Sequence, residues 1–369
     1  MIRIGVLTSS RADFGIYLPL LKRLQADAFF ELSIIAFGTH LSPAYGYTME
    51  QIEAAGFKVP YKIETAPADD TPAAIAAAMG LTTAKFAEFW NENKTSFDLV
   101  FCLGDRYEMF SAVMAGVPFQ VKFAHLHGGE TTLGAIDNVF RHAITLASKY
   151  HFVSTPDAAR KVEQITGNND HIYYVGALSL DNLEDIEFLT IGEFRQKWGV
   201  DLSKKTILTT FHPETVDYSN NQHYADELVK TIKSLDSYQV LVTMPNADTA
   251  GSIIRSALIT NFLDSETVFL TENLGTAGYF TAMKHCAFLI GNTSSGIIEA
   301  ASFGKYVINL GDRQKGRSAG NNVIHTPLNA EDITGAVHKI EKSEKPGNEN
   351  IYFNGGATTR IVETLKQIQ

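Results

Sequence analysis

Short apolar runs recur along the whole chain, and most of them end in Gly, Ser, Thr or Asp before a segment with amphipathic spacing. Continuous apolar runs of this length predict strands that are buried on both faces, and the amphipathic segments between them predict helices. The alternation predicts an α/β fold with parallel sheets covered by helices. The predicted strands are Ile2–Thr8, Leu32–Phe37, Leu99–Leu103, Val121–Leu126, His151–Ser154, Ile172–Val175, Thr206–Thr210, Val240–Met244, Val268–Leu270, Phe288–Ile290 and Tyr306–Leu310.

The predicted strands fall into two sets, separated by a charged, helix-like stretch at Asp181–Lys204. They are too numerous for one ordinary doubly wound sheet. We therefore predict two Rossmann-like doubly wound domains, 1–180 and 181–350, that face each other across a cleft in a GT-B type arrangement. Ligands of such sheets bind beyond the carboxyl ends of the strands. In the remaining residues, 351–369, an amphipathic segment at Thr358–Ile368 predicts a helix that packs back on the first domain.

Composition and charge narrow the functional classes. The chain has 369 residues, of which 45% are hydrophobic and 20% charged, as in a folded globular protein. Its net charge of −10 argues against nucleic-acid binding, which needs a basic surface. Met1–Leu7 begins directly with a strand pattern instead of a signal peptide, and no run is long enough to span a membrane, so we expect a cytoplasmic protein. Cys102 and Cys286 lie in apolar runs and are expected to be buried thiols.

The clearest chemical signal is a glycine-rich turn in the second domain, where a predicted strand ends and a helix is expected to start near Ser295. Unpaired N–H groups at such a helix start bind phosphate oxygens, so the turn predicts a nucleotide diphosphate site. A plain N-cap by Ser294 or Ser295 explains the same pattern. Glu299, expected in the first turn of this helix, could also accept hydrogen bonds from a ribose diol. The candidate residues are Gly291, Asn292, Thr293, Ser294, Ser295 and Glu299.

Other predicted strand ends in the second domain also carry polar residues. Arg313 follows one strand, with Lys315 and Arg317 beside it in a loop that is either a phosphate-binding loop or a solvated one. His212 and Asn246 follow two further strands, where each is either a phosphate donor or structural. Because the carboxyl ends of parallel strands share one edge, we expect these side chains on the same side as the glycine-rich turn.

Charged pairs end two strands of the first domain. Arg11 and Asp13 follow the first strand, and Asp105 and Arg106 follow the third. Helix capping would explain Asp13, but it leaves Arg11 unexplained. For Asp105 and Arg106, an N-cap beside a surface charge and a ligand-binding pair both remain open.

The densest polar stretch places His127, two glycines and Glu130 on one predicted turn, with Asp137 a few residues further on. His125 and His127 are expected on one strand face, which raises the question of a metal site. Without a cysteine or a third histidine at ligand spacing, we predict no metal. Several carboxylates and a histidine in one place favour general acid–base chemistry instead. The chain also lacks the serine-hydrolase elbow and the P-loop.

Taken together, these segments resemble the hydrolysing UDP-N-acetylglucosamine 2-epimerases of the bacterial sialic-acid pathway. The matching pieces lie in order and span nearly the whole chain. Their first loop lacks the Arg-Pro-Glu of the reversible branch. The pieces are SRADFG (10–15), GTHLSPAYG (38–46), LGDRYE (103–108), HLHGGETTLGAIDN (125–138), RHAIT (141–145), FHPET (211–215), PNADT (245–249), GNTSSGIIEAASFG (291–304) and INLGDRQKGR (308–317).

The resemblance implies a homodimeric enzyme without metal or nicotinamide that converts UDP-N-acetylglucosamine and water to N-acetylmannosamine and UDP through a 2-acetamidoglucal. It implies acid–base roles for Asp105, Glu130 and Asp137, and a role for Arg106 at the diphosphate or sugar. Other members have a glutamate at the position of His127, so the acid and base roles stay undivided. The residues implied to hold UDP are Arg11, His212, Asn246, Ser294, Glu299 and Arg313.

Four other functions remain open. The same chemistry could act on a UDP-2,4-diacetamido-trideoxyhexose or a related sugar nucleotide, or the enzyme could be a non-hydrolysing 2-epimerase. A glycosyltransferase would share the two-domain nucleotide site, but it would need fewer acid–base groups. A sugar-nucleotide-binding module is disfavoured by the many carboxylates at the predicted strand ends. Fold class does not separate these functions.

Overall fold

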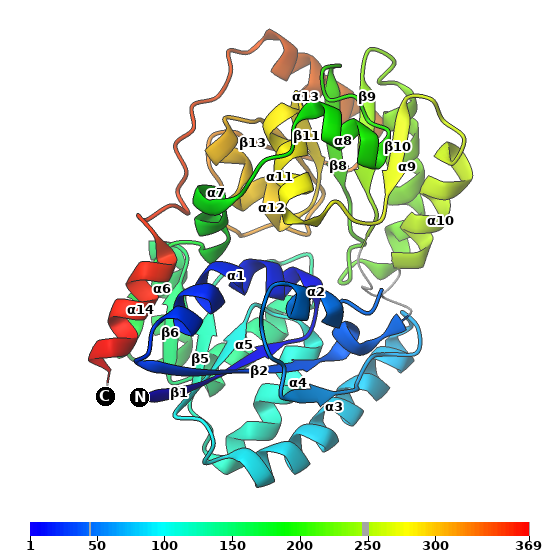
Figure 1. Ribbon diagram of the computed structural model, residues 1–369. Coiled ribbons are helices and arrows are strands. Elements are labelled where there is room, and N and C mark those ends of the chain that lie inside the picture. Colours follow the sequence, from blue (N-terminus) through cyan, green and yellow to red (C-terminus); the bar gives the residue numbers. More distant parts are fainter. Residues whose placement is uncertain (44–45, 246–250, 369) are drawn as a thin grey trace. The chain divides into compact units, whose positions relative to one another are not determined.

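The computed structural model describes residues 1–43, 46–245 and 251–368, and the chain divides into two compact α/β units (Figure 1). Each unit is built on one parallel sheet with helices on both faces, so the predicted pair of doubly wound units is confirmed. Unit 1 consists of Met1–Glu130, Asp137–Glu184 and Tyr352–Gln369, and unit 2 consists of Thr131–Ile136 and Asp185–Ile351.

The sheet of unit 1 has, within the described residues, seven parallel strands in the order β3-β2-β1-β4-β5-β6-β7. Its strands are β1 (Ile2–Thr8), β2 (Phe30–Phe37), β3 (Tyr61–Ile63), β4 (Leu99–Leu103), β5 (Phe123–Leu126), β6 (Tyr150–Val153) and β7 (Ile172–Tyr174). The strand order reverses between β1 and β4. Such a reversal opens a crevice at the carboxyl ends of the two strands, where ligands of this sheet type bind.

Helices cover both faces of this sheet because successive strand residues point to opposite sides. Val6 belongs to an apolar core that includes Tyr17 and Ile361. Its neighbour Leu7 belongs to a second core that includes Phe86. The helices of this unit are α1 (Arg11–Ala26), α2 (Met49–Ala54), α3 (Pro72–Asn93), α4 (Tyr107–Gly116), α5 (Asp137–Ala147), α6 (Pro156–Thr166) and α14 (Ala357–Gln367), and the short α7 (Asn182–Asp185) ends at the unit boundary.

The sheet of unit 2 has, among the residues described, six parallel strands in the order β10-β9-β8-β11-β12-β13. Its strands are β8 (Thr206–Thr210), β9 (Gln239–Thr243), β10 (Val268–Thr271), β11 (Phe288–Gly291), β12 (Val307–Leu310) and β13 (Val323–Thr326). Here the order reverses between β8 and β11. Unit 2 therefore has a switch point of its own.

Unit 2 also has a core on each side of its sheet. Ile207 lies in the core that includes Leu228 and Ile333, whereas the next residue, Leu208, lies in the core with Met283. The helices are α8 (Ile191–Trp198), α9 (Asn221–Lys233), α10 (Gly251–Phe262), α11 (Gly275–His285), α12 (Ser294–Ile298) and α13 (Ala330–Lys342). Of the helices described in the two units, none has the length and apolar character needed to cross a bilayer.

Helix α14 returns the chain to unit 1 after unit 2 is complete (Figure 1). The carboxylate of Asp181 accepts hydrogen bonds from the backbone N–H groups of Ala357, at 3.0 Å, and Thr358, the first residues of the helix. At the other end, Lys366 Nζ lies 2.6 Å from an Asp27 carboxylate oxygen at the end of α1. These contacts fix both ends of α14 on unit 1.

The segment Thr131–Ile136 leaves unit 1 and belongs to unit 2. Its Leu133 N–H donates to the carbonyl of Lys315 at 2.9 Å, and its Ile136 N–H donates to Thr215 Oγ1 at 2.9 Å. The loop between Glu130 and Asp137 is thus anchored on the loops that follow β8 and β12.

Candidate functional site

The predicted functional residues collect at the two switch points. In unit 1, Arg11 follows β1 and Asp105 follows β4, the two strands between which the order reverses. In unit 2, His212 follows β8 and Asn292 follows β11. Both sets lie at the carboxyl edge of their sheet, where a ligand has access to loops and helix starts.

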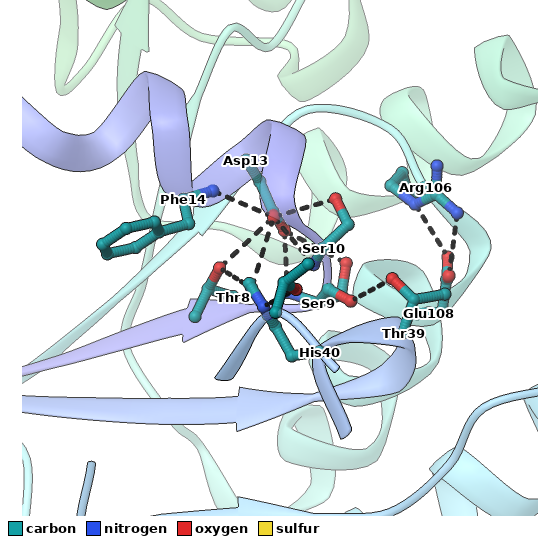
Figure 2. A network of polar contacts seen from close by, with 10 residues as sticks. Thr8, Ser9, Ser10, Asp13, Phe14, Thr39, His40, Arg106 and Glu108 are labelled. Atoms are coloured by element: carbon teal, nitrogen blue, oxygen red, sulfur yellow. Dashed lines mark hydrogen bonds and ion pairs between the residues drawn. The ribbon is translucent and has the colours of Figure 1, made fainter. Parts of the chain in front are cut away.

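The turn after β1 is organised by Asp13 (Figure 2). Its carboxylate accepts from the backbone N–H groups of Ser9, at 2.7 Å, and Ser10, at 2.8 Å, and from the hydroxyls of Thr8, Ser9 and Ser10. The side chain is buried, and Ser10 and Asp13 form the capping box of α1. Arg11 is the first residue of that helix and is half-buried. Capping thus accounts for Asp13, which shapes the turn that presents Arg11.

His40 lies beneath this turn, and the sequence had assigned it no role. Its Nε2 is 2.9 Å from Thr8 Oγ1 and its Nδ1 is 2.8 Å from Thr48 Oγ1, so both ring nitrogens are engaged (Figure 2). Burial lowers the pKa of His40 below its ordinary value, which favours the neutral ring. The neighbouring Thr39 donates to the carbonyl of Ser9 at 3.0 Å and ties the same loop to the turn.

The turn after β4 contains an arginine held by a buried carboxylate. Arg106 makes two hydrogen bonds to Glu108, Nε to Oε2 at 3.2 Å and Nη2 to Oε1 at 2.9 Å (Figure 2). Glu108 lies in the first turn of α4 and is 0% exposed, whereas one fifth of the Arg106 side chain, 20%, reaches solvent. The two-point contact fixes the plane of the guanidinium group, which is suited to holding phosphate or sugar oxygens. The sequence did not identify Glu108 as the residue that holds Arg106.

Arg141 joins the turns after β4 and β5. Its guanidinium donates through Nη2 to the carboxylate of Asp105 and through Nη1 to the backbone carbonyl of Glu130 at 2.8 Å. Arg141 is only 1% exposed, and it lies on α5 one turn after Asp137. The arginine therefore connects the Asp105 carboxylate to the backbone of Glu130. The sequence signal was its spacing of four residues from Asp137, which places both on one side of a helix.

A second set of hydrogen bonds connects the ends of β5 and β6. Oε1 of Glu130 lies 3.1 Å from Nδ1 of His127, and Ser154 Oγ donates to the same oxygen at 2.6 Å. Ser154 directly follows β6 and is fully buried, outside every motif identified in the sequence. The adjacent Gly129 has φ +77°, and a Cβ there would lie 2.3 Å from the carbonyl oxygen of Ala158 on α6. Only glycine lets the turn pack this closely.

His125 serves the fold, not a ligand. Its Nε2 lies 2.8 Å from the Gly104 carbonyl and its Nδ1 lies 3.1 Å from Thr145 Oγ1. Burial lowers the pKa of His125 to about 3, so the ring is neutral. The expectation that His125 and His127 share a strand face is wrong, because β5 ends at Leu126 and His127 has a left-handed φ of +62°. Within the described residues, no cluster of three or more His, Cys, Asp or Glu side chains is placed to hold a metal ion.

In unit 2 the glycine-rich turn follows β11. Gly291 has φ +151°, and a Cβ there would lie 1.9 Å from the Thr210 carbonyl oxygen, so the turn requires glycine. The N-cap of α12 is Thr293, whose Oγ1 accepts from the Ser295 N–H at 3.4 Å, and not the predicted Ser294 or Ser295. Glu299 is buried just past the end of α12, not in a first turn, because the helix stops at Ile298.

Asn292 connects this turn to the loop after β8. Its Oδ1 accepts from the His212 N–H at 2.7 Å, and its Nδ2 donates to the His212 carbonyl at 2.8 Å. Both polar atoms of the buried Asn292 side chain therefore hold His212 in place. Of the hydroxyls in the turn, Ser294 is exposed, while Thr293 and Ser295 are half-buried. A ligand can reach these three side chains.

The loop after β12 is joined to the same loop after β8. Arg313 Nη1 donates to the Pro213 carbonyl at 2.6 Å, and the Asp312 N–H donates to Glu214 Oε1 at 2.7 Å. Burial raises the pKa of Glu214. The cationic loop and the glycine-rich turn thus share one edge of the unit 2 sheet. Asn246, the other residue predicted here, lies outside the described residues.

Tyr279 is a further polar side chain at this edge that the sequence did not single out. It lies on α11, near the hydroxyls of Thr210 and Ser295 and the carboxylate of Glu299. Burial raises the pKa of its hydroxyl to about 12. The phenol therefore stays protonated. Its signal in the sequence, one tyrosine in an apolar helix, is indistinguishable from that of a core residue.

The sets of polar residues in the two units differ in chemistry. Unit 1 gathers carboxylates, a histidine and two arginines, which can transfer protons and hold anionic or polar groups. Unit 2 offers hydroxyls, turn backbone and an arginine, a set suited to phosphate oxygens.

Comparison with known proteins connects the chain to one family. The family model "UDP-N-acetylglucosamine 2-epimerase" matches residues 22–366. A Campylobacter jejuni protein named GDP/UDP-N,N'-diacetylbacillosamine 2-epimerase (hydrolyzing) is 34% identical over 93% of this chain and 88% of its own. A Legionella pneumophila UDP-N,N'-diacetylbacillosamine 2-epimerase (hydrolyzing) is 32% identical over 99% of this chain and 96% of its own. A Neisseria meningitidis UDP-N-acetylglucosamine 2-epimerase is 27% identical over 100% of this chain and 95% of its own.

The fold also matches solved structures that carry the name UDP-GlcNAc 2-epimerase. A crystal structure of UDP-GlcNAc 2-epimerase from Neisseria meningitidis bound to UDP-GlcNAc superposes with a TM-score of 0.83, at 17% identity, over 99% of this chain and 100% of that one. The match to the family model covers nearly the whole chain, including β4 of unit 1 and the switch point of unit 2, and begins after β1. The chain therefore belongs to the UDP-N-acetylglucosamine 2-epimerase family.

Proposed function

We propose that this protein is a hydrolysing 2-epimerase whose substrate is the nucleotide-activated 2,4-diacetamido-2,4,6-trideoxyglucose, UDP-N,N'-diacetylbacillosamine. It would use water to release the sugar as its C2 epimer, 2,4-diacetamido-2,4,6-trideoxymannose, together with UDP. The observation that carries this proposal is the set of relatives. The two proteins named for this hydrolysing reaction are 34% and 32% identical, against 27% for the one named for UDP-N-acetylglucosamine.

The sequence alone favoured UDP-N-acetylglucosamine as the substrate. The relatives favour one of the alternatives, UDP-N,N'-diacetylbacillosamine. The chemistry at C1 and C2 is the same for both sugars, so the acid–base residues do not distinguish them. They differ at C4 and C6, where diacetylbacillosamine has an acetamido group and a methyl group. Since the name of the Campylobacter jejuni relative includes GDP, the nucleotide also needs testing.

Unit 1 is suited to the proton transfers of this reaction. The C2 proton must leave while the C1–O bond to the nucleotide breaks, and water must then add with the opposite configuration at C2. Because the proton is weakly acidic, the base must be well placed and the leaving group stabilised. We assign the proton transfers to the cluster of Asp105, His127, Glu130 and Asp137, and assign Arg106 to the diphosphate or sugar.

Unit 2 is suited to the leaving group. We assign UDP binding to Gly291, Thr293, Ser294, Ser295, Glu299, His212 and Arg313. Arg11 stays a candidate from the sequence. Asp13 and Asn292 act indirectly in this assignment, because their polar atoms already bind the turns that present Arg11 and His212. Asn246 stays a candidate from the sequence alone.

The proposal is tested by incubating the protein in heavy water with UDP-N,N'-diacetylbacillosamine, its GDP counterpart or UDP-N-acetylglucosamine, and following each by proton NMR. We expect free 2,4-diacetamido-2,4,6-trideoxymannose with deuterium at C2, and UDP. We expect kcat/KM for this substrate to exceed that for UDP-N-acetylglucosamine on the order of 10²-fold, since an apolar pocket that fits the C6 methyl group rejects an analogue with an added hydroxyl by about that much.

Each other outcome identifies a different activity. Higher efficiency with UDP-N-acetylglucosamine would return the assignment to that sugar, and higher efficiency with the GDP sugar would change the nucleotide. An epimerised sugar still attached to UDP would indicate the non-hydrolysing reaction. No deuterium exchange and no nucleotide release with any of the three would refute the proposed reaction.

A further inference from the structure

We infer that His127 is the base that removes the C2 proton, and that Glu130 and Ser154 are positioning residues that hold its ring for this step. The inference rests on the proposed function and divides the roles within the unit 1 cluster. It starts from one shared atom. Oε1 of Glu130 accepts a hydrogen bond from the Ser154 hydroxyl at 2.6 Å and lies 3.1 Å from Nδ1 of His127.

The contacts around Glu130 determine which ring nitrogen of His127 carries hydrogen. Ser154 donates to the Glu130 carboxylate, and the Arg141 guanidinium is bound to the carbonyl of the same residue at 2.8 Å. A hydroxyl donor and a nearby cation both favour the ionised carboxylate, which can only accept hydrogen bonds. Nδ1 of His127 must then be the donor. In the neutral ring this leaves a lone pair on Nε2, the form that can take up a proton.

Nε2 of His127 is the atom left for a substrate. It is buried and makes no hydrogen bond to any part of the chain that the structure describes, and the whole residue is only 9% exposed. Buried polar atoms are almost always paired, and the exceptions call for a functional explanation. The backbone of His127 also has φ +62°, a left-handed conformation that costs a residue with a side chain energy and is concentrated at functional sites.

The proton transfer can be written completely with this tautomer. The Nε2 lone pair takes the C2 proton, the C2–H electron pair forms the C1–C2 double bond, and the C1–O pair leaves on the nucleoside diphosphate. The imidazolium formed lies against the Glu130 carboxylate, which stabilises its charge, and its proton passes to solvent after the diphosphate departs. In the second half-reaction another acid delivers a proton to the opposite face of C2. Water adds hydroxide to C1, and its remaining proton restores that acid.

Two carboxylates of the cluster, Asp105 and Glu130, are less suited to this first step. Asp105 is paired with Arg141, and Oε1 of Glu130 already faces two hydrogen-bonding groups. Either contact makes a carboxylate a weaker base.

The decisive experiment compares His127→Gln with Glu130→Gln in both half-reactions, using UDP-N,N'-diacetylbacillosamine and, separately, the corresponding 2-acetamidoglycal with UDP. We expect His127→Gln to slow elimination by about 10²- to 10⁴-fold, the usual contribution of a general base, and to retain hydration of the supplied glycal. Glu130→Gln should retain measurable turnover, because its amide oxygen can still accept from Nδ1. The acid limb of its pH–rate profile should move to lower pH, because the imidazolium loses its carboxylate neighbour.

The contribution of Ser154 is tested by Ser154→Ala against Ser148→Ala, a matched loss of a buried hydroxyl that donates to the Ile144 carbonyl at 2.8 Å. Without the Ser154 donor, the negative charge on Glu130 Oε1 is no longer partly compensated by a hydroxyl, so the carboxylate attracts the imidazolium more strongly. We expect Ser154→Ala to lower kcat with little change in KM and to move the acid limb to higher pH. Ser148→Ala should leave the profile in place. Equal profiles for the two variants would refute the role of Ser154.

Two results would overturn the role of His127. One is a less than about 10-fold loss of elimination in His127→Gln, far below a general-base contribution. The other is a Glu130→Gln protein that binds UDP and keeps its circular dichroism spectrum but eliminates at no pH, while His127→Gln stays active. Absence of turnover by the unmodified chain would instead refute the proposed function, so the two failures are distinguishable.

Discussion

At the scale of single residues, Arg141 shows how one buried side chain can serve two parts of a site. Its guanidinium contacts the Asp105 carboxylate and the Glu130 carbonyl while the side chain is almost entirely removed from water. A buried charge is tolerated only when it is paired, so removing either partner leaves an uncompensated group. The arginine therefore contributes to stability as well as to the positions of the Asp105 carboxylate and the Glu130 backbone.

We predict that Arg141→Gln lowers the free energy of unfolding by about 3 kcal/mol, the usual cost of breaking a buried ion pair. The matched control is Arg160→Gln, which removes the surface pair of Arg160 and Asp157, whose side chains are 66% and 59% exposed. Solvent screens such a pair, so this variant should unfold close to the parent chain. Urea unfolding of both variants measures the difference. Equal losses would show that Arg141 carries no special structural role.

A second residue-scale prediction concerns acid stability. The pKa of His125 is lowered to about 3 by burial, below the ordinary value of 6.5 that applies to the unfolded chain. Below about pH 6.5 His125 therefore binds a proton in the unfolded state but not in the folded state, and stability falls as the pH drops toward about 3. The expected slope for this residue is up to about 1.4 kcal/mol per pH unit.

This slope is measured by urea unfolding of the parent chain and of His125→Gln across that pH range. The slope of unfolding free energy against pH should be smaller in the variant by the contribution of one proton, since its amide does not titrate. His223→Gln, at an exposed position, controls for the loss of a histidine as such. An unchanged slope in His125→Gln would contradict the prediction.

Sequence patterns located the polar residues at strand ends, but not how they contact one another. Asp105 and Glu130 could be singled out because each follows a predicted strand in a polar turn. Arg141 could be placed on a helix, yet its two contacts depend on how that helix packs against β4 and β5. Ser154 carried no signal, because one serine at a strand end is ordinary. Long-range packing, which local patterns do not encode, decides these contacts.

At the scale of elements, helix α6 sets the shape of the turn between His127 and Glu130. A Cβ on Gly129 would lie 2.3 Å from the Ala158 carbonyl oxygen and 2.8 Å from Val162 Cγ2, both on α6. Gly167, just past the end of the same helix, has the same φ of +77° and nothing within 4 Å of such a Cβ. The two glycines share a conformation but differ in packing.

We predict that Gly129→Ala destabilises the protein by about 2 kcal/mol more than Gly167→Ala, since overpacking adds to the shared cost of a left-handed alanine. Thermal unfolding measures the stability difference. Gly129→Ala should also reduce kcat, because the turn that holds His127 must move away from α6. Gly167→Ala should keep kcat. Equal stability losses would show that α6 yields without disturbing the turn.

The same scale explains which strands could be predicted. The strand predicted at Leu99–Leu103 is β4 with the same bounds, because a strand buried on both faces leaves a continuous apolar run. Two short edge strands were missed, β3 at Tyr61–Ile63 and β13 at Val323–Thr326. Each has one neighbour, is only partly buried and contains an exposed polar residue, Lys62 in β3 and His325 in β13, so their sequences carry little apolar signal.

At the scale of the whole molecule, each unit has its own apolar cores, so each can unfold as its own cooperative body. The two tryptophans of the chain report on them separately: Trp90 lies in unit 1 and Trp198 in unit 2. Trp90→Phe and Trp198→Phe variants therefore each provide a fluorescence signal from one unit.

We predict that UDP stabilises the unit reported by Trp198, because the phosphate-binding set of residues lies in unit 2. At about 100 times the dissociation constant the shift in unfolding free energy should be about 2.7 kcal/mol. Arg313→Ala should reduce this shift, and Lys233→Ala, on the exposed end of α9, serves as the control. A shift confined to the unit reported by Trp90 would contradict the assignment of the nucleotide to unit 2.

The return of α14 to unit 1 has a consequence for the order in which the protein is made. Ile361, Val362 and Leu365 of α14 belong to the same core as Ile4 and residues of α1. On the ribosome, the first unit to begin emerging therefore cannot complete its core until residues 352–369 have been synthesised, whereas unit 2 has all its strands well before then. The part of the chain that is translated first is the part that matures last.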